Sequence, residues 1–182
     1  IGEVVRLVPG KPIRYLVNTH HHFDHSGGLR TYLSQGATIV THQGNRDFYQ
    51  NVMFHPGLRS LNPDRLAMFY PMFTTSRRPA PIESVNQKYV VSDGVRVLEI
   101  YPIQGLNHAQ DMVIAYLPSE KILVNADLYS PPPANAQPMS SPDPRMITLA
   151  QNIRRLNLEV DIHVPIHGFV GNHETFIGLV SE

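Results

Sequence analysis

Short apolar runs alternate along the chain with longer segments whose apolar residues recur at helical spacing. The runs are rich in β-branched residues and end in polar or turn-forming residues, which is typical of strands. They predict strands at 13–18, 37–41, 89–91, 95–103, 112–117, 122–125 and 162–166. The helically spaced segments predict helices at 26–36, 43–53, 64–69, 144–158 and 173–180. Strands that alternate with helices indicate a single layered α/β or α+β domain over residues 1–182.

The first residues have the pattern of the end of a helix. Their apolar side chains share one helical face, and Pro9-Gly10 then ends the element. We therefore expect that residues upstream of Ile1 have been lost, together with any signal sequence. The location consequently stays open between a bacterial periplasm or the exterior and the cytoplasm.

The composition excludes several classes of function. Fifteen Lys and Arg balance fifteen Asp and Glu, so the chain lacks the positive charge that nucleic acids and anionic membranes attract. No apolar run approaches the ~20 residues of a membrane span. Cysteine is absent, which excludes disulfides, thiolate nucleophiles and cysteine-based metal sites. We therefore expect a small-molecule substrate, with neither a nucleic acid nor a membrane as partner.

The most informative segment is Thr19-His20-His21-His22-Phe23-Asp24-His25, which directly follows a predicted buried strand. Its spacing is H-x-H-x-D-H, followed by Ser-Gly-Gly. Four potential metal-ligand side chains within six residues cannot all be buried against apolar neighbours without a large desolvation cost. Bound cations would balance the charge of the carboxylate and hold the imidazoles neutral. A purification tag would not contain Phe23 and Asp24 or follow a strand. The segment therefore predicts a metal site.

This motif resembles the T-H-x-H-x-D-H signature of the metallo-β-lactamase superfamily. Three later residues stand in the order that the family requires, each just beyond the end of a predicted strand: His108, Asp127 and His167. The resemblance implies a four-layer αβ/βα sandwich. Only 19 residues precede His20, so we expect the opening strands of the first sheet to be missing. If the chain is naturally this short, a homodimer or strand exchange would have to cover the exposed edge.

The resemblance also implies a dinuclear site, most simply two Zn²⁺ per chain, with iron or manganese as alternatives because no thiolate is present. One ion would be held by His20, His22 and His108, and the other by Asp24, His25 and His167. Asp127 would bridge the two ions. A hydroxide between the ions would attack the substrate, and Asp24 would orient the water and relay its proton.

The sequence indicates only the chemical class of the substrate. Asp127 stands where the main antibiotic-hydrolysing members carry Cys, which favours the glyoxalase II and lactonase branch. We expect a small, largely uncharged ester, lactone, thioester or amide, with a β-lactam still open. Tyr129 is a candidate for placing a hydroxyl near a developing oxyanion. The Met- and aromatic-rich segment 53–81 could cover the site as a lid or pack on the domain itself, and the Pro-rich loop 130–144 could form a further wall.

Two alternatives from other classes remain. One is a mononuclear iron oxygenase or persulfide-oxidising enzyme on the same fold, which would use fewer of these ligands. The other is a non-catalytic metal-binding remnant, which conflicts with a complete set of seven ligands. The remaining histidines are interpreted as non-ligands: His21, His42, His55, His163 and His173.

Overall fold

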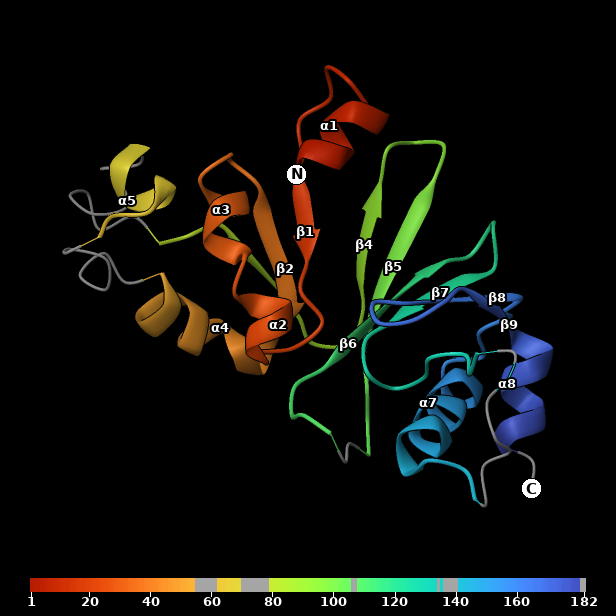
Figure 1. Ribbon diagram of the computed structural model, residues 1–182. Helices are drawn as coiled ribbons and strands as arrows, with labels where there is room; N and C mark the ends of the chain where they lie inside the picture. The colour runs from red at the N-terminus through yellow and green to blue at the C-terminus, as the bar shows by residue number, and fades with distance from the viewer. Residues whose placement is uncertain (55–61, 70–78, 106–107, 134, 136–140, 181–182) are drawn as a thin grey trace.

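Two β-sheets form the centre of the molecule (Figure 1). The computed structural model describes residues 1–54, 62–69, 79–105, 108–133, 135 and 141–180. The first sheet has three parallel strands in the order β1 (Tyr15–Val17), β2 (Thr38–His42) and β3 (Ile82–Val85). The second sheet has six strands in sequence order: β4 (Tyr89–Ser92), β5 (Val97–Pro102), β6 (Val113–Leu117), β7 (Ile122–Asn125), β8 (Ile162–Pro165) and β9 (Gly171–Asn172). Neighbouring strands of this sheet run antiparallel, except that β7 and β8 are parallel.

Helices cover the outer face of each sheet, as Figure 1 shows on its two sides. The first sheet is covered by α3 (Leu29–Leu33), α4 (Arg46–Phe48) and α5 (Arg65–Phe69), with a 3-10 turn at Gln43–Asn45 before α4 and a π-helical turn at Tyr49–Met53 after it. The second sheet is covered by α7 (Pro144–Arg155) and α8 (His173–Val180). Two short helices, α1 (Gly2–Leu7) and α2 (Phe23–Ser26), flank β1 in sequence. No described helix is long and apolar enough to cross a bilayer.

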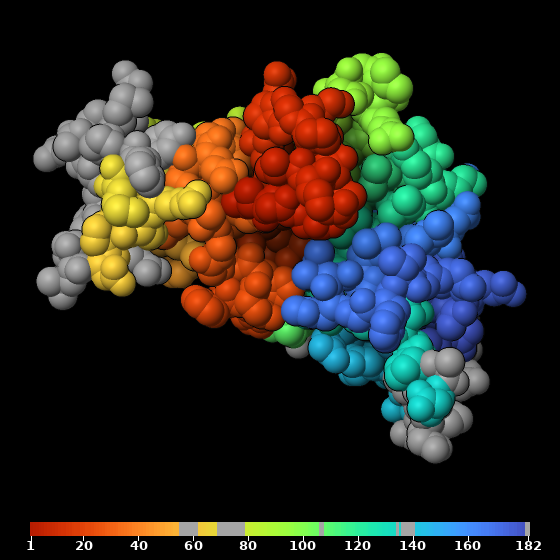
Figure 2. Space-filling view, turned by 45° about the horizontal axis from the view of Figure 1, so that its top comes forward, coloured from red at the N-terminus to blue at the C-terminus, as the bar shows by residue number. Residues whose placement is uncertain are grey.

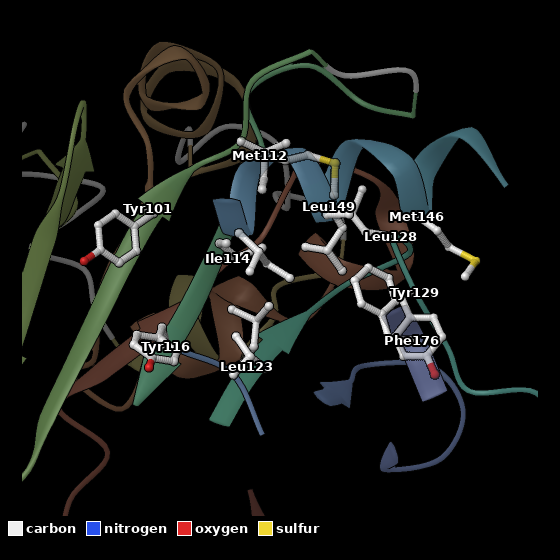
Figure 3. Packing of buried hydrophobic residues seen from close by; sticks show 14 of the residues in the cluster. Tyr101, Met112, Ile114, Tyr116, Leu123, Leu128, Tyr129, Met146, Leu149 and Phe176 are labelled. Carbon is white, nitrogen blue, oxygen red and sulfur yellow. The ribbon is translucent and has the colours of Figure 1, made fainter. Parts of the chain in front are cut away.

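Alternating residues along the strands divide the core into three clusters. On β2, Ile39 packs toward the helices of the first sheet, whereas Val40 packs between the sheets. On β6, Val113 joins the layer between the sheets, whereas Ile114 packs under α7 and α8. Figure 3 shows this last cluster, in which fully buried side chains such as Leu123 each contribute roughly 1.5–3 kcal/mol. The α/β fold class predicted from the sequence, with a helix–sheet–sheet–helix order of layers, is confirmed.

The structure differs from the predicted elements at several places: the short strand β9 was not predicted, and the helix predicted over 43–53 is divided into three helical turns of different type. The single helix predicted over 26–36 is divided into α2 and α3 at Gly27-Gly28. A Cβ at Gly27 would lie 2.8 Å from the carbonyl oxygen of Phe23, so the chain turns where only glycine fits. Strand β3 was not predicted, because it is four residues long and follows Pro79 and Pro81. Most of the proposed 53–81 lid, and His55, lie outside the described residues, as does part of the 130–144 loop.

Candidate metal centre

The side chains predicted as ligands meet where several loops converge at one edge of the sandwich. Each loop follows the carboxyl end of a strand, as expected for sites in α/β folds. Strand β1 leads to residues 20–25, and β5, β7 and β8 lead to the loops that carry His108, Asp127 and His167. The N–H of Val113 donates to the carbonyl of Thr19 (2.9 Å), which joins the loop after β1 to the second sheet.

Asp127 lies at the centre of the group. Its Oδ2 atom is 2.8 Å from Nε2 of His25 and 3.3 Å from Nε2 of both His20 and His108. Its Oδ1 atom is 3.6 Å from Nε2 of His167. The backbone of Asp127 has a φ of 60°, in the left-handed region that aspartate adopts more readily than most residues. One carboxylate therefore faces ligands from both of the predicted metal sites.

The other ligands form two groups around this carboxylate. The nitrogen atoms of His20, His22 and His108 all lie within 4.8 Å of one another. In the second group, Nε2 of His167 is 3.2 Å from both Nε2 of His25 and Oδ2 of Asp24. The structure thus brings together all seven side chains in the two sets predicted from the sequence, with Asp127 between them.

The arrangement fits bound cations better than hydrogen bonds among the side chains. Nε2 of His20 and Nε2 of His108 are buried and have no hydrogen-bond partner among the described residues, a costly state for polar atoms unless a ligand is present. Two nitrogen atoms that each lie ~2.05 Å from one tetrahedral zinc ion are ~3.3 Å apart, close to the observed separation of the His25 and His167 nitrogens. The donor set of five imidazoles and two carboxylates suits divalent zinc, iron or manganese.

The state of His20 also suits a ligand. Burial lowers its pKa to about 4, with the neighbouring His25 as the next contribution, so the ring is neutral near pH 7 and keeps a free lone pair. Oγ1 of Thr19 lies 3.2 Å from Nδ1 of His20. When Nδ1 donates to this hydroxyl, Nε2 is the nitrogen that faces Asp127 and the space between the ligands.

A buried hydrogen-bond network around Asn18 contacts the loop of the histidine motif, and it was not predicted from the sequence. The side-chain amide of Asn18 donates to the carbonyl of His25 (3.1 Å). Its Oδ1 atom accepts from the hydroxyl of Tyr49 (2.5 Å) and from Oγ1 of Thr41 (3.4 Å). The sequence predicted a buried strand here, but β1 is exposed at Tyr15 and half-buried at Leu16 and Val17, and only Asn18 at its end is buried. The asparagine between the strand and the histidine motif was the signal that could have indicated this role.

Comparison with known sequences gives the same assignment over most of the chain. A family model described as the metallo-beta-lactamase superfamily matches residues 3–162. The chain belongs to this superfamily. A search of curated proteins found no significant match.

Solved structures of the superfamily fold resemble the chain at low sequence identity. A metallo-beta-lactamase from Pontibacter korlensis is 20% identical with a TM-score of 0.62, over 98% of this chain and 73% of that protein. The rubredoxin oxygen:oxidoreductase of Desulfovibrio gigas is 17% identical with a TM-score of 0.65, over 98% and 45%. The flavodiiron protein of Giardia intestinalis is 18% identical with a TM-score of 0.64, over 100% and 44%. The chain thus spans under half the length of the last two proteins, and the likeness establishes the fold alone.

The side chain of Tyr129 packs in the hydrophobic core on the helix-covered face of the second sheet. Its N–H donates to Oδ1 of Asn125 (3.0 Å), and the turn directs its ring into the core beside Phe176 and His163, as Figure 3 shows for Phe176. Its hydroxyl is buried and has no partner among the described residues. The structure gives Tyr129 a packing role, and the oxyanion role predicted from the sequence is supported by no recorded contact.

Among the described residues, the histidines interpreted as non-ligands lie outside both ligand groups and do not join Asp127. His21 is exposed on the motif loop. Nδ1 of His42 accepts from the N–H of Gly44 (3.0 Å) at the start of a helical turn. His163 and His173 contact each other under α8, with a distance of 2.8 Å between Nε2 and Nδ1.

Two cavities lie beside the candidate metal centre. One of about 350 Å³ lies beside Asp24 and His25 and is lined mainly by the end of β1, α3 and Ile166. In Figure 2 a hollow lies where the surfaces of the N-terminal (red and orange) and C-terminal (blue) segments meet. The other, of about 220 Å³, adjoins Asp127 and the start of α7. The centre is therefore accessible from two directions.

Proposed function

We propose that the protein is a metal-dependent hydrolase that uses two divalent cations, most simply zinc, to cleave a small ester, lactone, thioester or amide. The observation that carries the proposal is the convergence of five histidines and Asp24 around the central carboxylate of Asp127. A bound pair of such cations lowers the pKa of a shared water toward ~7 and so supplies a nucleophile at neutral pH.

The chain's own residues divide the work. His20, His22 and His108 would hold one cation, and Asp24, His25 and His167 the other, with the two oxygens of Asp127 between them. These ligands would hold both cations in defined positions, because they come from loops that follow strands of the two sheets.

Asp24 is suited to handle a proton. Desolvation raises its pKa, but its backbone hydrogen bond and the nearby His25 and His167 lower it more, so its pKa lies below the ordinary value. The carboxylate is therefore ionised at neutral pH, and most of its surface is exposed to solvent. It can orient a water molecule at the centre and accept its proton.

Metal quantification followed by a substrate panel tests the proposal. Chelated protein should be inactive, and activity on an ester, lactone, thioester or amide should return with two equivalents of zinc. His20→Ala should bind one equivalent fewer and lose turnover. His21→Ala is the matched control, because this exposed neighbour is not a predicted ligand, and it should retain both. Undiminished hydrolysis by chelated wild-type protein would contradict the proposal.

A redox function on the same fold is the second candidate, because two of the similar structures are a rubredoxin oxygen:oxidoreductase and a flavodiiron protein. It predicts iron rather than zinc in protein purified from its native source. Iron at one or two equivalents, with no hydrolysis by any metal-loaded form, would favour this candidate over the hydrolase.

A further inference from the structure

The smaller cavity places one cationic side chain beside the central carboxylate. Its volume is about 220 Å³, and it lies between the loop after β7 and the first turn of α7. Its wall includes Asp127, Asp143 and Arg145 together with Leu128, Tyr129, Ser130 and Met146. Among the described residues of this wall, Arg145 is the only basic one. A group that enters the cavity therefore meets the guanidinium and the metal-binding carboxylate together.

Asp143 holds the guanidinium by one edge. Its carboxylate accepts from the backbone N–H of Arg145 (2.8 Å), which caps α7, and from Nε (3.1 Å) and Nη2 (2.6 Å) of the same side chain. Arginine has five N–H donors. The two on Nη1 and the second on Nη2 have no recorded partner among the described residues. Asp143 therefore holds one edge of the guanidinium in position, and these three donors lie at its other end.

The charges around Arg145 keep this end cationic. Asp143 raises the pKa of Arg145 most, and the charge of Asp127 raises it further, which also places Arg145 within electrostatic range of the metal centre. The side chain is 42% exposed, so a ligand from solvent can reach it. A planar fork of N–H donors matches the two oxygens of a carboxylate better than any neutral group.

We propose that the free edge of Arg145 binds a carboxylate of the substrate, so that the preferred substrates are small esters, lactones, thioesters or amides that also carry a carboxylate. This inference rests on the proposed hydrolase function. The small volume of the cavity admits a carboxylate on a short chain, whose scissile group then lies toward Asp127 and the other ligands.

Two esters of equal chain length test the inference on the zinc-loaded protein. Monophenyl adipate carries a carboxylate, whereas phenyl hexanoate has a methyl group in its place. Arg145→Gln should lower kcat/KM for monophenyl adipate about 10- to 100-fold, because hydrogen bonds to a charged group are lost, and should change phenyl hexanoate by less than about twofold. Arg145→Lys, which keeps the charge but not the fork, should give an intermediate loss. Arg154→Gln is the matched control, since Arg154 is exposed on the same helix and does not line the cavity.

Calorimetric titration with adipate, which cannot be hydrolysed, separates this inference from the proposed function. The Kd of adipate should rise about tenfold or more in Arg145→Gln and stay unchanged in Arg154→Gln. An equal adipate Kd and an equal ratio of ester rates in wild type and Arg145→Gln would overturn the inference while leaving the hydrolase proposal intact. If zinc-loaded wild type cleaves neither ester, the adipate Kd values alone decide whether Arg145 binds a carboxylate.

Discussion

In the half of the metal centre formed by His20, His22 and His108, the side chain of His20 is completely buried and that of His108 is 21% exposed. In the half formed by Asp24, His25 and His167, the side chains of Asp24 and His167 are 61% and 52% exposed. Buried ligands have fixed positions before a cation arrives, whereas exposed ones must be ordered by it. We therefore expect the first half to retain its cation and the second half to exchange its cation and to face the substrate.

We expect the largest effect on cation affinity from a substitution that weakens both halves of the metal centre at once. Asp127 contacts ligands of both, so Asp127→Asn should weaken both cations together. The loss should be at least about 100-fold in affinity for each equivalent, because even residues that only support a ligand account for 10- to 100-fold. Titration with a chromophoric chelator measures both steps. Loss of one cation with the other unchanged would show that Asp127 serves a single site.

Alanine variants of one ligand from each half test the comparison directly. His167→Ala should release the weakly held cation and leave one tightly bound equivalent. His20→Ala should release the tightly held one, and the remaining cation should dissociate at a chelator concentration about tenfold lower than that in His167→Ala. Equal affinities for the equivalents that remain in the two variants would show that burial does not separate the halves.

We expect the half formed by Asp24, His25 and His167 to depend more strongly on pH, because two paired histidines lie below the loop that carries His167. His167 lies in the loop between β8 and β9, and the paired rings of His163 and His173 lie at the base of this hairpin. Burial, and then the charge of His173, lowers the pKa of His163 to about 4. The unfolded chain takes up this proton near pH 6.5, but the folded chain only near pH 4. Stability contributed by neutral His163 is thus present above pH 6.5 and is lost as the pH falls from 6.5 toward 4.

The expected loss for His163 is up to roughly 3 kcal/mol over this range. Urea unfolding of chelated wild type and His163→Gln at pH 7, 5.5 and 4 measures it, and chelation keeps metal release from adding to the slope. The glutamine variant should lose less stability between pH 7 and pH 4 than wild type does. Parallel pH profiles would show that His163 is not buried in a neutral form.

The sequence located the ligands more completely than it located their supports. The H-x-H-x-D-H spacing is a local signal, and His108, Asp127 and His167 each follow a strand that the apolar pattern also identifies. The role of Asn18 could not be predicted in the same way. Tyr49, which donates to it, is 31 positions further along the chain, and only the packing of α3, β2 and the turn at Tyr49–Met53 brings the two together.

The role predicted for Tyr129 from its proximity in sequence stays a prediction. Tyr129 follows Asp127 by two positions, which suggested a role at the same site. Asp127 has a positive φ, the N–H of Tyr129 donates to Asn125, and the ring of Tyr129 packs against Phe176 and His163. Backbone conformations of this kind depend on the tertiary contacts around them and have no clear signature in a single sequence.

The smallest effect we expect concerns the support beneath His25. Tyr49→Phe leaves Oδ1 of Asn18 with only the longer bond from Thr41, which should cost about 1–2 kcal/mol of unfolding free energy. Because Asn18 also holds the carbonyl of His25, this variant should bind the second cation about two- to tenfold more weakly. Tyr116→Phe is the matched control, since that buried hydroxyl donates to the carbonyl of Glu159 (2.5 Å), on the far side of the second sheet from the first. Both variants should lose similar stability in urea unfolding, but only Tyr49→Phe should weaken cation binding. If both variants changed cation binding equally, the Asn18 network would stabilise the fold without positioning His25.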